Sequence, residues 1–272
     1  MIIRNDNTMI IELVSLRYNI SSQLRIKLIA DIINKSESSF ILFSGHSLKE
    51  EQDLYDLNER ITNRESTTLL EIKSYEVLKT VYSHKQVFQK LNNCLYLIND
   101  GIVSSLNTFQ LFSESKHIEN NEPLCERFIN ELETRRIFSL QNKICLVLQC
   151  GEINIIKNLQ TENNKPVFRH SQRSDLLHRF ENLLNNTDII FNPIHSPMGN
   201  QGKMSKRREY FSSNKRYYFS VSQNGIIKRK DIVSIMPMST NSLQYSYYDG
   251  KALEEFYRET NTNYQIRKFL IA

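Results

Sequence analysis

Glycine and proline are scarce in this chain of 272 residues, which has seven of the first and five of the second. Long flexible linkers, which are rich in such residues, are therefore excluded. No apolar run approaches the roughly 18–20 residues that cross a bilayer, and residues 1–7 lack a signal-peptide pattern. We expect a single soluble, cytoplasmic domain over residues 1–272, with no membrane partner.

Cysteine is also rare, and its four copies are too few and too scattered for a disulfide scaffold in a chain of this length. Cys145 and Cys150 lie in one apolar, strand-like run, and two residues so placed along a straight strand cannot bridge. No Cys-x-x-Cys pair and no histidine cluster occurs in the sequence. We therefore expect reduced thiols, no metal and no cofactor.

The chain carries a formal net charge of +5. Its densest basic stretch is residues 203–216, and a run of this kind is usually the solvated face of a helix. Nucleic-acid binding would also require aromatic stacking platforms or a docking motif, and the sequence shows neither. A nucleic-acid partner is not expected.

Hydrophobic residues make up 40% and aromatic residues 10% of the chain, enough for a sizeable core. Short apolar runs alternate with amphipathic segments. The runs predict strands at 9–16, 39–43, 67–72, 143–149, 188–191 and 217–222, and the amphipathic segments predict helices at 21–34, 50–64, 175–185 and 204–213. Asp100-Gly101 between two apolar runs predicts a β-hairpin. This alternation indicates a layered α/β domain with a mixed sheet.

Cys150 is the sharpest candidate for chemistry. It follows the buried strand 143–149 and precedes Gly151 and Glu152. Reactive side chains gather at strand ends in such folds, because the sheet holds them rigid where substrate can reach them. Gly151 permits a tight turn whose backbone N–H groups could hold an oxyanion. The alternative is that Cys150 is a buried small hydrophobe, as most free cysteines are.

Two other strand ends carry candidate pocket residues. Asn192 precedes a proline that forces the chain out of regular structure, and His195 lies in the loop that follows. His46 follows the strand 39–43 and is a candidate acid–base group, although a lone loop histidine is more commonly part of the polar surface. With Gly151 and Glu152, these three residues are our candidates for the substrate pocket.

In their order and spacing, these segments resemble the carbon–nitrogen hydrolase (nitrilase-like) superfamily. The segments that carry the resemblance are residues 40–48, 95–101, 143–152, 188–193 and 214–225. The third is similar to the family strand that ends in a nucleophilic cysteine followed by an acid, and the fourth to its "D-hydrophobic-N-P" strand. The resemblance spans 9–225, and 226–272 is a divergent C-terminal extension. It implies an αββα sandwich with mixed sheets and a homo-oligomer, commonly a homodimer.

The family is known for a Glu–Lys–Cys triad. The cysteine attacks an amide or nitrile carbon, the glutamate shuttles protons, and the lysine stabilises the tetrahedral centre. Cys150 matches the nucleophile. Where the family has its lysine this chain has Phe109, and Lys116 would reach the site only through an enlarged hairpin. An ordinary loop lysine is the alternative.

The family glutamate is missing, because Gly45 stands at its position and a glycine cannot move a proton. The candidate replacement is Glu71, an acid in an otherwise apolar strand. An unpaired buried carboxylate costs several kcal/mol, so Glu71 should face a partner or a cleft. Outward orientation on its strand is the competing interpretation.

Two functions follow. The first is a thiol-dependent hydrolase of a carbon–nitrogen bond in a small-molecule amide or nitrile, with catalytic Cys150, Glu71 and Lys116. The second, motivated by Gly45, is a catalytically degenerate member that serves as a binding or assembly module. In either case we expect the loops 46–56, 117–131 and 195–206 to set specificity.

Overall fold

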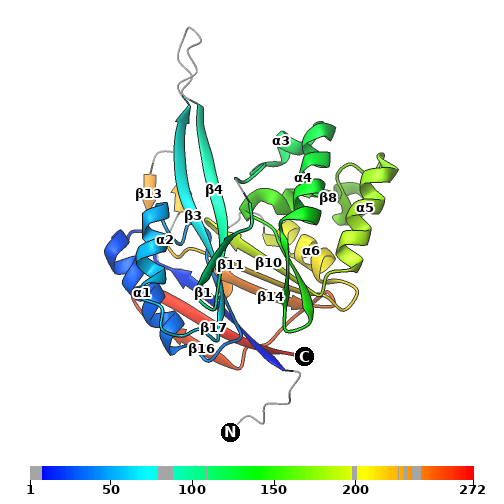
Figure 1. Ribbon diagram of the computed structural model, residues 1–272. Helices are drawn as coiled ribbons and strands as arrows, with labels where there is room; N and C mark the ends of the chain where they lie inside the picture. Colours follow the sequence, from blue (N-terminus) through cyan, green and yellow to red (C-terminus); the bar gives the residue numbers. More distant parts are fainter. Residues whose placement is uncertain are drawn as a thin grey trace.

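The structure is a computed structural model, and it describes residues 8–78, 88–107, 109–197, 201–225, 227–229, 232–234 and 240–272. In this part of the chain, two mixed β-sheets lie face to face with helices outside both (Figure 1). This αββα sandwich confirms the predicted fold class. No helix among these residues is both long and apolar enough to cross a membrane.

The first sheet has seven strands in the order β16-β17-β1-β2-β3-β4-β5. Their bounds are β1 (Met9–Leu16), β2 (Phe40–Phe43), β3 (Thr67–Leu78), β4 (Phe88–Asn99), β5 (Ile102–Ser105), β16 (Tyr257–Thr260) and β17 (Tyr264–Ile271). Strands β1, β2 and β3 are parallel, and the strands outside them are antiparallel to their neighbours.

The second sheet has six strands in the order β15-β14-β11-β10-β7-β6. Their bounds are β6 (Ile137–Leu140), β7 (Lys143–Val147), β10 (Ile189–Ile194), β11 (Tyr217–Ser222), β14 (Gln244–Tyr248) and β15 (Lys251–Ala252). Strands β7, β10 and β11 are parallel. Two ribbons stand apart from the sheets, formed by β8 (Ile156–Leu159) with β9 (Lys165–Phe168) and by β12 (Ile227–Arg229) with β13 (Ile232–Ser234).

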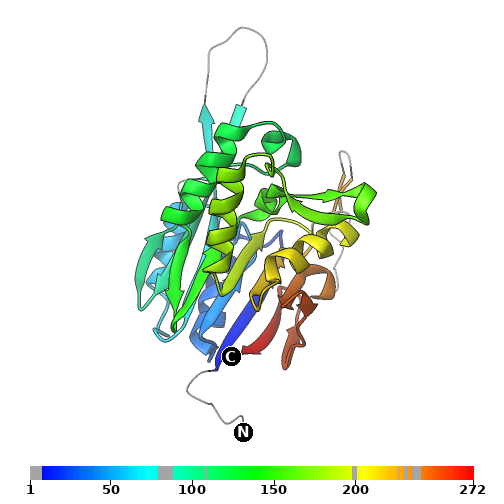
Figure 2. The same cartoon turned by 90° about the vertical axis from the view of Figure 1, so that its right-hand side faces the viewer.

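Helices cover the outer face of each sheet (Figures 1 and 2). Helices α1 (Ser22–Lys35) and α2 (Glu51–Asn58) pack on the first sheet, and α4 (Glu122–Thr134), α5 (Ser174–Asn185) and α6 (Gln201–Ser212) pack on the second. The short segments are α3 (Ser115–Ile118), α7 (Thr240–Leu243) and the 3₁₀ helices η1 (Cys150–Ile155) and η2 (Gln160–Glu162). The Ser21 side chain caps α1 by accepting a hydrogen bond from the Leu24 N–H.

The apolar runs form strands that are buried on both faces. In β1, Leu13 packs in the layer between the sheets, whereas Val14 packs against the helices. Strands buried on both faces read as continuous apolar runs, which is why the sequence identified them. The hairpin predicted at Asp100-Gly101 is also confirmed, since β4 and β5 pair across it and both residues have positive φ, at 48° and 74°.

The C-terminal extension contributes strands to both sheets. β17 pairs with β1 along its whole length, from Met9 opposite Ile271 to Leu16 opposite Tyr264. β14 pairs with β11 in the second sheet. Residues outside the family resemblance therefore add strands to both layers of the sandwich.

Only part of the basic stretch 203–216 is the solvated helix face that the sequence indicated. Arg207, Arg208 and Arg216 are buried. The Arg208 guanidinium lies 3.5 Å from the centre of the Tyr245 ring. Arg207 donates hydrogen bonds to side-chain amide oxygens. Guanidinium groups can be buried in this way because their planar N–H fork finds polar and aromatic partners inside the protein.

Phe191 tests the packing between the sheets. It is fully buried and stacks on Phe40, with ring centroids 4.1 Å apart. Replacing it with alanine should lower the free energy of unfolding by about 3–5 kcal/mol, because a cavity opens between two rigid sheets. Urea unfolding measures this, with Ile102→Ala as the control, since Ile102 is 67% exposed. Equal effects of the two substitutions would contradict the placement of Phe191 in the core between the sheets.

Candidate active site

Three strand ends and the interior of a fourth strand, from the two sheets, converge at one place. Gly45 and His46 follow β2, Glu71 lies on β3, Cys150 begins η1 just after β7, and His195 follows β10. The Gly45 N–H donates a 3.1 Å hydrogen bond to the Ile194 carbonyl, which joins the ends of β2 and β10 across the sandwich. Chain segments that are far apart in sequence therefore bring these side chains together.

Glu71 is fully buried and faces this group. Its Oε2 accepts a 2.7 Å hydrogen bond from the His46 N–H and lies 2.6 Å from Nε2 of His195. Its Oε1 accepts a 2.7 Å hydrogen bond from Nε2 of Gln149. The carboxylate is thus paired on both oxygens, as a buried charge must be.

Glu71 and His195 form a buried ion pair. Burial by itself would raise the pKa of Glu71, but the charge of His195 and the His46 N–H lower it to about 2. Burial would lower the pKa of His195, but the charges of Glu71 and Cys150 raise it to about 10. At neutral pH the pair is therefore a carboxylate facing an imidazolium.

His195 also contacts the thiol. A side-chain hydrogen bond to Cys150 contributes to the raised pKa of His195. Cys150 is partly exposed, whereas Cys125 and Cys145 are buried. His195 therefore connects a buried carboxylate to an accessible thiol, the order of groups that activates a nucleophile.

The ring of His46 stacks on that of His195, with centroids 3.5 Å apart and planes at 15°. His46 has a φ of 55°, a left-handed conformation that is uncommon outside glycine. Nε2 of Gln223 holds this turn by donating to the carbonyls of Gly45 and His46, at 2.7 and 2.8 Å. The turn directs the His46 N–H at Glu71, so its strained backbone serves the ion pair.

Gly45 is required by the same pair. A Cβ at this position would lie 2.5 Å from Cδ2 of His195 and 2.8 Å from Oε2 of Glu71. The Glu71 carboxylate thus reaches, from the neighbouring strand, the space that a side chain at position 45 would enter. From the family resemblance we expected an acid to be missing at Gly45, and in the structure the carboxylate of Glu71 lies beside this glycine.

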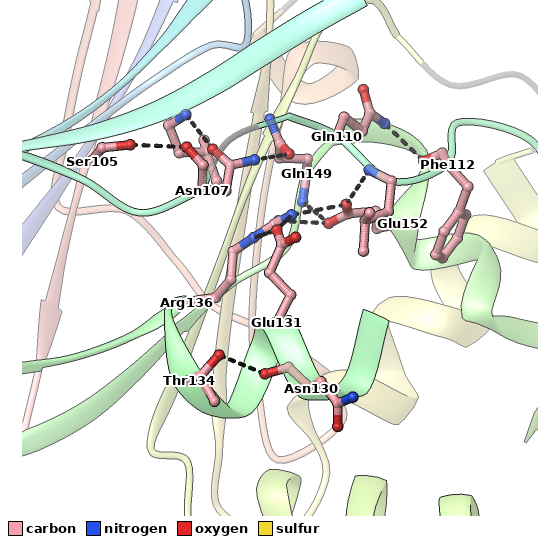
Figure 3. A network of polar contacts seen from close by, with 12 residues as sticks. Ser105, Asn107, Gln110, Phe112, Asn130, Glu131, Thr134, Arg136, Gln149 and Glu152 are labelled. Carbon is pink, nitrogen blue, oxygen red and sulfur yellow. Dashed lines mark hydrogen bonds and ion pairs between the residues drawn. The ribbon is translucent and has the colours of Figure 1, made fainter. Parts of the chain in front are cut away.

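Glu152 is part of a separate buried ion pair (Figure 3). Nη1 of Arg136 donates to its Oε2 at 2.8 Å, and the Gln149 N–H donates to the same oxygen at 2.7 Å. Arg136 also pairs with Glu131. Glu152 was a pocket candidate, but in the structure it anchors the turn that carries Cys150.

Close packing also requires a glycine at position 151. A Cβ there would collide with the backbone of Ser113. The segment before α3 therefore crosses directly over the turn that carries Cys150, and any larger residue would displace one of the two.

Sequence reasoning missed the two amides that position Glu71. Oδ1 of Asn107 accepts a 2.7 Å hydrogen bond from the Leu95 N–H, and its Nδ2 donates to Oε1 of Gln149 at 2.6 Å (Figure 3). Gln149 in turn donates to Glu71. The sequence did contain a signal for these two residues, since both are amides that follow apolar runs and Gln149 is adjacent to Cys150.

Lys116 does not join this group, which corrects the role expected of it. Its side chain is 72% exposed on α3 and lies 2.9 Å from the Glu114 carboxylate. The hairpin is not enlarged, because β5 ends at Ser105 and Asn107 turns inward. The cation beside Cys150 is His195 instead.

Asn192 is buried within β10. Its Nδ2 donates to the Leu148 carbonyl at 3.0 Å, and its Oδ1 accepts from the Tyr218 hydroxyl at 2.8 Å. Both ends of this amide thus bind protein groups and link β10 to its neighbours. It supports the site rather than lining the substrate pocket that was expected of it.

His46 and Gln223 also line a cavity of about 870 Å³. Its other walls are Tyr18, Asn19, Ile20, Ser21, Arg25, Lys49, Glu50, Glu51 and Lys73. Part of the loop expected to set specificity, residues 46–56, thus faces a ligand-sized space. Next to it, His46, Glu71 and His195 together offer three metal-ligating atoms that lie within 4.8 Å of one another.

No family model and no curated protein matches the sequence. Solved structures do match. A CN-hydrolase superfamily protein from Xanthomonas campestris, with an arsenic adduct in its active site, is 12% identical over 98% of this chain and 91% of its own, with a TM-score of 0.55. The chain has the nitrilase-like fold.

Two further structures share this nitrilase-like fold. One is a glutamate-to-leucine variant of an amidase from Nesterenkonia sp. AN1, modified by fluoroacetamide at its active-site cysteine, which is 8% identical over 99% of this chain and 93% of its own, with a TM-score of 0.56. The other is a glutamine-dependent NAD(+) synthetase from Cytophaga hutchinsonii, 11% identical over 97% of this chain with a TM-score of 0.56. This chain covers 43% of that synthetase.

The pH dependence of stability tests the ion pair. The raised pKa of His195 stabilises the fold below its ordinary value of 6.5, and this stability is lost as pH rises toward about 10. The lowered pKa of Glu71 stabilises the fold above 4.5, and this stability is lost as pH falls toward about 2. The free energy of unfolding in urea should therefore be greatest between these windows.

Glu71→Gln should remove most of both slopes, because it removes the charge that shifts both groups. Glu162→Gln is the matched control, since Glu162 is exposed and forms a surface ion pair with Lys165. The same pH profile in both variants would show that the Glu71–His195 pair does not contribute to stability.

Proposed function

We propose that this chain is a thiol-dependent hydrolase of carbon–nitrogen bonds, acting on a small-molecule amide or nitrile through a covalent intermediate on Cys150. The observation that supports this most directly is the line Glu71–His195–Cys150, in which an accessible thiol contacts an imidazolium held by a buried carboxylate. Cys150 and His195 follow strands β7 and β10 of the second sheet, and Glu71 lies within β3 of the first.

In the first half-reaction, Cys150 acts as a thiolate beside the His195 imidazolium. The sulfur attacks the amide carbon, and the carbonyl oxygen takes the negative charge. His195 then donates its proton to the leaving amine as the carbon–nitrogen bond breaks, which leaves a thioester on Cys150 and a neutral imidazole. A nitrile would give a thioimidate in the corresponding step.

In the second half-reaction, neutral His195 accepts a proton from water as the water oxygen attacks the thioester. The carbon–sulfur bond breaks, the carboxylic acid leaves, and the thiolate and imidazolium are restored. Every proton that moves is held by His195 or by the reactants.

Glu71 acts as a positioning residue in this scheme. With a pKa of about 2 it is a weak proton acceptor at neutral pH. It orients His195 and keeps that ring charged. The proton-shuttling role that the resemblance assigned to a glutamate, and the cationic role that it assigned to a lysine, both fall to His195 in this proposal.

The degenerate-module alternative rested on the glycine at position 45. The buried carboxylate of Glu71 beside Gly45 removes that motive, so we do not propose it. The expected homodimer, the cytoplasmic location and the lack of a nucleic-acid partner stay predictions.

Alkylation tests the activated thiol. Iodoacetamide at neutral pH should label Cys150 at least about 10-fold faster than the other three cysteines, because the thiolate is the reacting species. Burial raises the pKa of Cys94, of Cys125 to about 12, and of Cys145. Mass spectrometry of the labelled peptides gives the rates.

His195→Asn should slow labelling of Cys150, whereas His178→Asn should not, because His178 is exposed on α5. If Cys94 reacts as fast as Cys150 in the unaltered protein, the thiol is not activated and the proposed mechanism is wrong.

Turnover tests the reaction itself. Ammonia release from short aliphatic amides and nitriles should fall at least about 100-fold in Cys150→Ser and in His195→Asn, since general acid–base catalysis contributes 10²–10⁴-fold. Glu71→Gln should retain partial activity with an altered pH profile. Cys94→Ser is the matched control. Undiminished turnover in Cys150→Ser would exclude the covalent mechanism.

A further inference from the structure

The cavity beside His46 has two buried polar side chains in its wall with unsatisfied atoms. Its walls come from the loops that follow β1 and β2 and from the first turns of α1 and α2. Arg25 and Gln223, which both line it, are 2% and 1% exposed. Buried polar groups are nearly always hydrogen-bonded, so unsatisfied ones around a space of about 870 Å³ point to a ligand.

Arg25 brings an unsatisfied positive charge to this wall. Its Nη2 donates to the carbonyls of Arg17 and Tyr18, at 3.1 and 2.7 Å. Among the described residues, its Nε and Nη1 have no hydrogen-bond partner, and no carboxylate forms an ion pair with it. Asp53 attracts it from a greater distance, but Oδ2 of Asp53 accepts two backbone N–H groups at the start of α2. A buried cation of this kind is costly unless an anion pairs with it.

The charges around the cavity favour an anion with a single negative charge. Three basic and two acidic side chains line it, which leaves an excess of one positive charge (three minus two). These side chains are Arg25, Lys49, Lys73, Glu50 and Glu51. A carboxylate carries one charge, and its two oxygens match the planar N–H fork of an arginine.

The start of α1 adds to this preference. Ser21, the N-cap of this 14-residue helix, lines the cavity, and no acidic residue lies in the first turn. The partial positive charge at the helix N-terminus is therefore not offset within the helix itself. Anions are stabilised at such an end.

Gln223 supplies a hydrogen-bond acceptor to the same cavity. Its Nε2 donates to the carbonyls of Gly45 and His46, which fixes the orientation of the side-chain amide. Its Oε1 is buried and has no hydrogen-bond partner in the part of the chain that the structure describes. An amide oxygen accepts from an N–H or O–H group, so this atom calls for a donor on the ligand.

We propose that the cavity binds a small molecule that carries one carboxylate and one N–H group, with the carboxylate at Arg25 and the N–H at Oε1 of Gln223. Gln223 holds the turn of His46, whose N–H binds Glu71. The bound molecule is therefore connected by hydrogen bonds to the Glu71–His195 pair. Its effect on turnover rests on the proposed function, whereas its binding does not.

N-acetylglycine is the probe, because it has one carboxylate and one amide N–H. N-ethylacetamide is the matched neutral compound, in which a methyl group stands in place of the carboxylate. Calorimetric titration into the full-length Cys150→Ser chain measures binding without turnover. N-acetylglycine should bind at least about 10-fold more tightly than N-ethylacetamide, because charge-assisted hydrogen bonds are roughly twice as strong as neutral ones.

Two exposed residues of opposite charge test the electrostatic preference without disturbing the core. Lys49 and Glu51 both line the cavity and are exposed. Lys49→Gln should weaken the binding of N-acetylglycine and Glu51→Gln should strengthen it, each by up to about 5-fold, the range of exposed ion pairs. Neither substitution should change the affinity for N-ethylacetamide.

Arg25→Met should weaken the binding of N-acetylglycine at least about 30-fold, because truncating one member of a buried charge pair is costly. Urea unfolding checks that this variant is folded, since Nη2 of Arg25 also holds the loop after β1. The proposal is overturned if N-acetylglycine does not bind or if N-ethylacetamide binds as tightly. It is also overturned if Lys49→Gln and Glu51→Gln change the affinity in the same direction.

Turnover by the unaltered chain separates two sources of the carboxylate. If the acid is part of the substrate, N-acetylglycine is hydrolysed with a higher kcat/KM than N-ethylacetamide. If it is a separate molecule, N-acetylglycine is not hydrolysed and changes kcat/KM for neutral amides. Binding by a chain that hydrolyses no amide or nitrile would reject the proposed function and leave the cavity site standing. Hydrolysis with equal affinity for the two compounds would do the reverse.

Discussion

The ion pair between Glu71 and His195 is the constraint to which the other features of the site are fitted. Removing two charges from water is expensive, and their attraction offsets that penalty only where further hydrogen bonds satisfy the remaining atoms. Here the His46 N–H and the Gln149 amide complete the shell of the carboxylate. Gly45 keeps the space beside it free of a side chain.

Residues from both sheets hold the groups that surround this ion pair. Gln149 is held by Asn107, whose own oxygen binds the backbone of β4 at Leu95. His46 is held by Gln223, which follows β11 of the opposite sheet. The hydrogen bonds of such a buried polar network strengthen one another, so the network contributes more than its separate contacts do. The thiol therefore faces an imidazole whose orientation is set from both layers of the sandwich.

A second buried ion pair supports the turn that carries Cys150. Glu152 and Arg136 are both fully buried, and Glu152 accepts the backbone N–H of Gln149. Breaking such a pair by removing one partner typically costs about 3–5 kcal/mol, because it leaves an uncompensated charge. The acid two residues after Cys150 thus anchors the turn, and the acid that meets His195 comes from another sheet.

Local pattern was sufficient to predict the layers and the position of Cys150 at the end of a strand. The apolar runs at β1, β2, β7 and β10 identified strands buried on both faces, and Asp100-Gly101 identified the hairpin, because both signals depend on neighbouring residues alone. Cys150 could be singled out because a strand end is a local feature. The family resemblance rested on the same kind of signal, namely the order of short segments.

The tertiary structure determined which charged residues lie next to one another in the site. Glu71 and His195 are 124 positions apart and meet only because β3 and β10 belong to sheets that pack face to face. Periodicity cannot show such a contact, nor that Lys116 faces solvent while Arg208 is buried. By itself the sequence determined the fold class and placed a thiol at a strand end. Which charged group stands beside that thiol depends on how two sheets dock, and that information is spread over the whole core.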